Sequence, residues 1–195
     1  MAQALTEVQI SYEAWLSEAP RGMAPMAQIP RLMRFASAAD MQAAITEGGF
    51  RAVVDASHGF DAASSRHAQA ATEALGLPYL RITRAPWSLG GLVNVGSVVD
   101  AVSANTRVPS GARVFCATGW DSLSDYAGFR GEVLMLRQTR RHSRPAPYPF
   151  VDLIFSDPPF TVQSEQALFR KLAVDMLICR NLGGTASRPK LDAAC

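Results

Sequence analysis

Five short segments of the chain combine small, polar and cationic residues in a way that suits an anionic ligand. Each follows an apolar run typical of a buried strand; they are Asp55-Ala-Ser-His-Gly-Phe60, Arg84-Ala-Pro-Trp87, Ala117-Thr-Gly-Trp120, Ser156-Asp-Pro-Pro-Phe160 and Arg180-Asn-Leu-Gly-Gly184. Glycine lets the backbone approach a phosphate or acyl group, and free N–H groups at the start of a following helix favour an anion. In open parallel sheets, ligands bind beyond the carboxyl ends of the strands. The five segments therefore predict a ligand site at such an edge.

The polar residues of the first two segments have two interpretations each. Asp55 and Ser57 either cap a helix expected from Ala62 or contact a ligand. His58, in a turn, has either a structural or a ligand-binding role. Trp87 follows a proline, which is more typical of packing than of stacking on a ligand.

The later segments also have a structural interpretation. Thr118-Gly119 is either a turn before a short helix or a ligand contact, and Gly183-Gly184 is either a flexible connection or a ligand contact. A basic cluster lies between these segments and consists of Arg137, Arg140, Arg141, His142 and Arg144. A solvated face is the default interpretation of this cluster, and the more specific alternative is that it binds a carboxylate or phosphate ligand.

One tetrapeptide points to different chemistry. Asp157-Pro158-Pro159-Phe160 follows an apolar strand and resembles the [D/N]PP[Y/F] signature of S-adenosylmethionine-dependent amino-methyltransferases. Those enzymes also need a glycine-rich loop after an early strand, and here Asp55-Ala-Ser-His-Gly59 offers one glycine. The sequence has no GxGxxG fingerprint, no Ser-His-Asp triad in a recognised context and no metal-ligand cluster.

The elements that must position these segments alternate along the whole chain. Strands are predicted at 7–12, 31–35, 51–55, 78–83, 113–117, 132–136, 150–155 and 176–179, with a proline-containing loop at 17–30. Helices are predicted at 37–47, 62–75, 95–105, 121–129 and 164–174 and from Ser187, the fourth of them capped by Asp121. Strands separated by helices imply βαβ units and parallel pairing. The predicted fold class is therefore α/β, with doubly wound, mainly parallel sheets.

The best linker by composition is Asn105-Thr-Arg-Val-Pro-Ser-Gly111. It predicts an N-terminal lobe at 1–107 and a C-terminal lobe at 108–195.

Length and composition exclude several classes of protein. The chain has 195 residues, 48% of them apolar and 18% charged, so it can bury a core and disorder is not expected. A net charge of +2 is not that of a dedicated nucleic-acid binder. Its apolar runs are too short to cross a bilayer, and the N-terminus lacks the pattern of a signal peptide. Cys116, Cys179 and Cys195 lie far apart, which favours reduced thiols in the cytoplasm over a disulfide framework or a metal site.

Taken together, the motifs resemble the precorrin-6A reductase family of cobalamin biosynthesis. The segment at 55–61 is similar to the family's DATHPFA, that at 78–87 to PYLRxxRPxW, and that at 117–119 to TTG. Pro158-Pro-Phe160 with Glu165 resembles a GPF turn before a helix. The segments at 180–184 and 190–194 are similar to KNSGG and KLxAA. The order and spacing agree from about residue 5 to the end.

This resemblance implies an enzyme with two Rossmann-like lobes and a ligand cleft between them. It would reduce precorrin-6A, or its cobalt form, to precorrin-6B with NADPH. The implied cofactor-binding residues are Thr118, Gly119, Asn181, Gly183 and Gly184. The implied substrate-binding residues are Asp55, Ser57, Arg84 and Trp87, and His58 is the implied catalytic residue. The implied partner is a small tetrapyrrole, without nucleic acid or membrane.

The chain departs from the family at its ends and within the motifs. The family begins with a strand and a GGTxEAR-like turn, whereas the opening Ala-Gln-Ala-Leu-Thr-Glu resembles only the end of the helix that follows that turn. We therefore expect the first lobe to lack that strand and turn, and the second lobe to lack a last strand. Within the motifs, Gly59, Trp120, Arg180 and Leu182 replace a proline, an arginine, a lysine and a serine. The alternatives to a reductase are a methyltransferase-like enzyme using residues 157–160 and a non-catalytic degenerate homologue.

Overall fold

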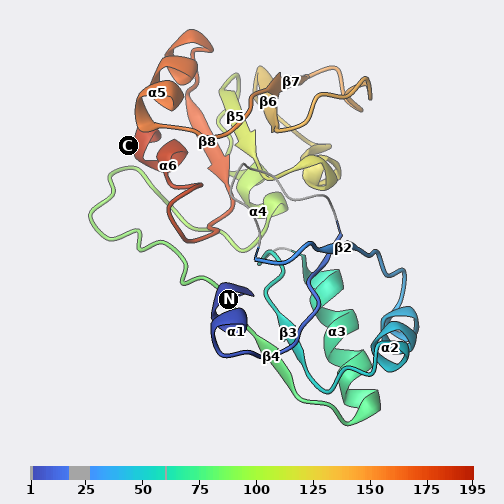
Figure 1. Cartoon of the computed structure of the whole chain (residues 1–195). Coiled ribbons are helices and arrows are strands. Elements are labelled where there is room, and N and C mark those ends of the chain that lie inside the picture. Colours follow the sequence, from blue (N-terminus) through green and yellow to red (C-terminus); the bar gives the residue numbers. More distant parts are fainter. Residues whose placement is uncertain (1, 18–26, 60) are drawn as a thin grey trace. The chain divides into compact units, whose positions relative to one another are not determined.

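The computed structural model describes residues 2–17, 27–59 and 61–195. The chain forms two compact units, unit 1 at Met1–Thr83 and unit 2 at Arg84–Cys195. Figure 1 traces both along the sequence. The sequence placed the division after residue 107, whereas the structure groups residues 84–107 with unit 2. The physical reason is packing, because Ala104 and Val108 are buried in the core of unit 2.

Unit 2 is built on a parallel sheet of four strands. They are β5 (Arg113–Ala117), β6 (Val133–Gln138), β7 (Val151–Phe155) and β8 (Met176–Cys179), in the order β7-β6-β5-β8 (Figure 1). Each follows the sequence prediction to within a few residues. Ala117 at the end of β5 pairs with Cys179 at the end of β8. The carboxyl ends of these two strands therefore meet at one edge of the sheet.

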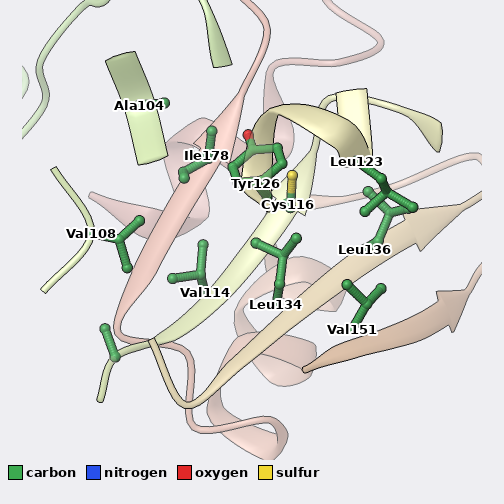
Figure 2. Close-up of a cluster of buried hydrophobic side chains, with 11 residues drawn as sticks. Ala104, Val108, Val114, Cys116, Leu123, Tyr126, Leu134, Leu136, Val151 and Ile178 are labelled. Carbon is green, nitrogen blue, oxygen red and sulfur yellow. The ribbon is translucent and has the colours of Figure 1, made fainter. Parts of the chain in front are cut away.

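Both faces of this sheet are buried, as the alternation of its side chains requires. Figure 2 shows one face, where Val114 and Cys116 of β5 pack with Leu134 and Leu136 of β6. On the opposite face, Phe115 and Met135 pack against α5 and α6; that core cluster comprises Phe115, Val133, Met135 and Phe169.

Four helical elements belong to unit 2: α4 (Ala101–Thr106), the 3₁₀ helix η1 (Trp120–Tyr126), α5 (Val162–Lys171) and α6 (Pro189–Ala194). Thr161 caps α5 by accepting the Ser164 N–H. The predicted cap of η1 by Asp121 is wrong. Gly119 holds that position with φ 91°, and Asp121 lies inside the first turn.

The described residues of unit 1 form two small parallel sheets and three helices. One sheet pairs β1 (Trp15–Leu16) with β2 (Arg31–Leu32), and the other pairs β3 (Val53–Asp55) with β4 (Tyr79–Arg81). The helices are α1 (Ala2–Glu7), α2 (Ala38–Glu47) and α3 (Ala62–Leu75). The bounds of α3 agree with the prediction, and Gly76 ends it in the left-handed conformation.

Two predictions for unit 1 need correction. The strand predicted at 7–12 does not form, because residues 8–10 make the turn that ends α1. In that turn Gln9 has φ 56° and the Ile10 N–H donates to the Leu5 carbonyl. The strand ending at Asp55 is buried on one face only. Val53 packs near Met41 and Ile45, whereas Val54 points away and is 37% exposed. Most of the loop predicted at 17–30 lies outside the described residues.

The predicted fold class is confirmed as mixed α/β with parallel sheets. Among the described residues, we found no helix with both the length and the apolar content that a membrane span requires.

Candidate functional site

The turn after β5 and the turn after β8 lie together at the carboxyl edge of the sheet in unit 2. Gly119 adopts φ 91°, a conformation that favours glycine. A β-carbon at Gly119 would lie 3.7 Å from the Arg180 guanidinium. The structure thus places a glycine turn and a cationic side chain side by side where the sequence predicted a ligand site.

A buried chain of hydroxyl and thiol groups fixes the conformation of this turn. The Oγ1 of Thr118 lies 3.0 Å from the Sγ of Cys116 and 2.6 Å from the Oγ of Ser122. The Ser122 hydroxyl in turn donates to the Gly119 carbonyl over 2.8 Å. Burial raises the pKa of the Cys116 thiol, which therefore stays protonated. The Thr118 side chain is engaged within the protein, so the backbone of the turn is the part that could meet a ligand.

Trp87 and Asn181, which are 94 residues apart, form a close polar clamp. The side-chain Oδ1 of Asn181 accepts the Trp87 backbone N–H over 2.7 Å, and its Nδ2 donates to the Trp87 carbonyl over 3.0 Å. The indole Nε1 of Trp87 also donates to the Gly184 carbonyl over 2.7 Å. Three hydrogen bonds therefore hold the Arg84–Trp87 segment against the turn after β8.

The two glycines of this turn allow the same close approach. A β-carbon at Gly183 would lie 2.1 Å from the Ala85 carbonyl oxygen, and one at Gly184 would lie 3.2 Å from the Arg84 Cδ. Both glycines have positive φ, 64° and 70°. The predicted site residues Arg84, Trp87, Asn181, Gly183 and Gly184 are thus brought together in unit 2. Among them, Gly183-Gly184 is a fixed contact and not a flexible connection.

Two cationic side chains lie near the Trp87 ring. The Arg188 guanidinium carbon is 6.0 Å and the Lys190 Nζ 5.9 Å from a ring centroid of Trp87. Lys190 donates to the Ser187 carbonyl over 2.7 Å, and burial lowers its pKa. The sequence prediction did not include these two residues, although they share the helical segment that follows Gly184.

A buried ion pair joins β6 to α5. The Nη1 of Arg137 donates to both carboxylate oxygens of Glu165, over 2.8 and 2.9 Å, and the two side chains are 6% and 1% exposed. The guanidinium also lies between the rings of Phe115 and Phe160, at 4.7 and 4.4 Å. Arg137 therefore departs from the solvated basic face that was the default interpretation. Its alternation with Val133 and Met135 along β6 was the available signal that it faces α5.

In unit 1, Asp55 accepts several hydrogen bonds. One carboxylate oxygen accepts the Ser57 backbone N–H over 2.8 Å, and the other accepts the Tyr79 hydroxyl over 2.7 Å and the Arg81 Nη1 over 3.3 Å. Burial alone would raise the pKa of Asp55, but the hydrogen bonds from Ser57, Ser65 and Tyr79 outweigh it and lower the pKa to about 2. Asp55 is therefore ionised throughout the neutral range.

The interpretation of Asp55 and Ser57 as caps of α3 is wrong. Asp61 is the residue that caps this helix, and its side chain accepts the Ser64 N–H. The Ser57 hydroxyl lies 3.1 Å from that of Ser65. His58 is exposed, and its carbonyl accepts the Asp61 N–H. Asp55 and Ser57 are thus positioned by each other and by β4, with His58 next to them in the turn.

The Asp-Pro-Pro-Phe motif follows β7 at the same edge. Its aspartate, Asp157, is exposed, while Phe160 packs on the Arg137 guanidinium. In this structure, the phenylalanine thus covers the buried ion pair.

The fold and these positions define a class of protein: parallel α/β proteins whose candidate ligand-binding turns follow the sheet strands at their carboxyl ends. The family described as Precorrin-6x reductase CbiJ/CobK matches residues 1–195. The chain belongs to this family.

Several relatives of the chain are named precorrin-6A reductase. The chain is 33% identical over 188 residues to the precorrin-6A reductase of Rhodobacter capsulatus, covering 94% of this chain and 74% of the relative. It is 32% identical to the precorrin-6A reductase of Mycobacterium tuberculosis, covering 84% of this chain and 66% of that protein, just under two thirds of its length. A solved structure of the CobK precorrin-6A reductase superposes with a TM-score of 0.79 at 31% identity, over 86% of this chain and 69% of the other. These relatives are reductases, so they do not support the methyltransferase alternative.

Proposed function

We propose that this protein reduces precorrin-6A in cobalamin biosynthesis and that its reductant is NADPH. The observation that carries the proposal is the match of all 195 residues to one family of precorrin-6x reductases. It is supported by the position of the predicted ligand turns in unit 2, which lie at the carboxyl edge of one parallel sheet.

The residues at this edge fit a dinucleotide. The Gly119 turn offers backbone close to where a phosphate would lie, and Arg180 beside it supplies positive charge. We assign cofactor binding to Thr118 and Gly119 through their backbone, with Arg180 as a further cationic contact. When bound, NADPH supplies a hydride to one carbon of a double bond, and a proton added to its partner atom completes the conversion to precorrin-6B and NADP⁺.

In this proposal, the ligand is not contacted directly by Asn181, Gly183 and Gly184. Their contacts hold Arg84 and Trp87 in place, which are the residues proposed to meet the substrate. Guanidinium groups can pair bidentately with the carboxylates of the substrate, and Arg84 is exposed. Asp55, Ser57 and His58 remain proposed substrate contacts, with His58 as the candidate proton donor.

A binding experiment separates this proposal from its alternatives. The melting temperature of the purified chain is measured with NADPH, NADH and S-adenosylmethionine, because a ligand that binds only the native state raises it. We expect a rise with NADPH. A rise with S-adenosylmethionine alone would favour the methyltransferase, and no rise with any of them would favour a non-catalytic homologue.

A kinetic experiment then tests the residue roles. We expect oxidation of NADPH that depends on added precorrin-6A. His58→Ala should lower turnover, whereas His67→Ala, at a second histidine of unit 1, should not. Equal activity of the two variants would assign His58 a structural role.

A further inference from the structure

Arginine and histidine side chains of the loop that follows β6 form a row with two aromatic rings, which lie at the ends of β5 and β7. The Arg144 guanidinium lies 4.2 Å from the ring centroid of Trp120, which begins η1. The His142 ring meets Trp120 edge-on at 5.2 Å and Phe155, at the end of β7, at 5.3 Å. The Arg141 guanidinium lies 5.6 Å from the Phe155 ring. The row therefore runs from Arg144 to Arg141 across the carboxyl edge of the sheet.

A hydrogen bond between two residues of the loop orders this row, and the arginine and histidine side chains of the loop are exposed to solvent. The Arg144 backbone N–H donates to the Nδ1 of His142 over 3.2 Å. Arg141, His142 and Arg144 are exposed, whereas the two rings beneath them are half-buried. Within the described part of the chain, the guanidinium groups of Arg141 and Arg144 form no hydrogen bond or ion pair. A guanidinium that lies over a ring face still has its N–H donors in its own plane, where they can bind an anion.

The position of this row in the topology is specific. β5 is the first strand of the sheet in unit 2, the Gly119 turn and η1 follow it, and β6 pairs directly beside it. In a dinucleotide-binding fold, the group at the end of the second strand, about 20 residues after the glycine turn, reads the adenosine ribose. An acidic residue there binds the 2′-hydroxyl of NAD, and an arginine accepts the 2′-phosphate of NADP. Here Arg140 and Arg141 follow β6, and the sequence has no Asp or Glu from Val133 to Val151.

We infer that Arg141 and Arg144, held on Phe155 and Trp120, bind the 2′-phosphate of the adenosine half of NADPH. This inference rests on the proposed cofactor and adds the residues that would distinguish it from NADH. The guanidinium group nearer the ribose would donate charge-assisted hydrogen bonds to the phosphate, and the group at the other end of the row would attract it through its charge. Trp120 has a positioning role, because it sets the plane of the Arg144 guanidinium without touching the phosphate.

The test measures binding of fragments by titration calorimetry, without turnover. The full chain is titrated with 2′-AMP and 5′-AMP, and separately with NADPH and NADH. We expect Arg141→Gln and Arg144→Gln each to weaken 2′-AMP and NADPH binding about tenfold or more, with little change for 5′-AMP and NADH. The control is Arg130→Gln, an exposed arginine of unit 2 outside the loop, which should change none of these affinities.

Two further variants test the positioning role of Trp120. Trp120→Phe keeps an aromatic face and should retain the preference for 2′-AMP, whereas Trp120→Ala should lose most of it. Circular dichroism of each variant distinguishes this from a failure to fold. Equal loss in both variants with normal folding would remove Trp120 from the inference.

The competing source of an anion is the substrate, and a polycarboxylate porphyrin serves as its probe. If Arg141→Gln and Arg144→Gln weaken porphyrin binding but leave 2′-AMP binding unchanged, the row reads substrate carboxylates and the inference is overturned. Unchanged binding of both probes overturns it as well. A selective loss of 2′-AMP binding supports it even if the chain does not turn over precorrin-6A, so a failure of this inference can be told apart from a failure of the proposed reaction.

Discussion

The parallel sheets of the two units are covered by other elements to different extents. In unit 2 the parallel sheet is buried on both faces, and Leu134 and Leu136 have no exposed surface. In unit 1 the β3–β4 sheet is packed on the side of α2 and α3, while Val54 and Leu80 on its other side are 37% and 58% exposed. A parallel sheet is stable when both faces are covered. Apolar strands of similar sequence therefore contribute unequally to the stability of the fold, because the contribution depends on how many faces of their sheet are covered.

Arginine–carboxylate pairs in the two units show the same contrast in burial when Arg137–Glu165 of unit 2 is compared with Arg81–Asp55 of unit 1. Arg137 and Glu165 are almost fully buried, whereas Arg81 is 30% exposed and lies 3.3 Å from Asp55. Asp55 also accepts hydrogen bonds from Ser57 and Tyr79. Glu165 has Arg137 as its only hydrogen-bond partner among the side chains described.

The largest effect is expected from the buried pair. Glu165→Ala leaves the Arg137 charge uncompensated and should lower the free energy of unfolding by about 3–5 kcal/mol. Arg81→Ala in unit 1 should cost at most about 1 kcal/mol, because the pair is partly solvated and Asp55 keeps its other donors. Chemical unfolding of both variants measures this difference, with Gln163→Ala on the exposed side of α5 as a control. Similar costs for the two pairs would contradict the contrast in burial.

Next in size is a matched pair of leucine truncations. Leu136→Ala removes a fully buried side chain of unit 2 and should cost about 2–5 kcal/mol. Leu80→Ala removes a mostly exposed one of unit 1 and should cost about 0.5 kcal/mol or less. Thermal melts of the two variants provide the measurement. A large cost at Leu80 would mean that the second face of the β3–β4 sheet is covered in solution.

A smaller effect is expected where the chain makes its closest backbone approach. Gly183→Ala places a methyl group against the Ala85 carbonyl at a positive φ, which should cost about 2 kcal/mol and loosen the Trp87 clamp. Gly111→Ala has a similar φ of 76° and no atom within 4 Å, so it should cost about 1 kcal/mol. Indole fluorescence and melting report the two consequences separately. If both variants behave alike, the contact with Ala85 does not contribute.

The smallest effect concerns the pH dependence of unit 1. The pKa of Asp55 is lowered from 3.8 to about 2, so its contribution to stability is present above about pH 4 and is lost as the pH falls through about 2. Asp55→Asn should cost about 1–2 kcal/mol at neutral pH and should reduce the loss of stability between these two values. Hydrogen exchange of the β3 and β4 amides follows this unit specifically. Asp40→Asn, at an exposed position of α2, is the control, and an unchanged acid profile in Asp55→Asn would show that other groups govern it.

Local sequence signals determined the elements that need only neighbouring residues. The bounds of α3 followed from its apolar pattern and from Gly76, and the strands β5 and β8 followed from apolar runs between polar turns. The same signals located the turns at Gly119 and Gly183-Gly184, because strand ends and glycines can be recognised from the sequence itself. They failed at residues 7–12, where the predicted strand gives way to the turn that ends α1, with Gln9 at φ 56°.

The partners of the site residues were decided by the tertiary structure alone. The sequence marked Asn181 and Trp87 as ligand contacts, but their pairing spans 94 residues and depends on the fold that brings the segment after β4 to the turn after β8. It placed Arg137 with a solvated loop, while the sheet turned it toward Glu165 on α5. Local periodicity says which face a side chain takes, but not what covers that face. Sheet order and layer packing set that, and they involve residues far apart in the chain.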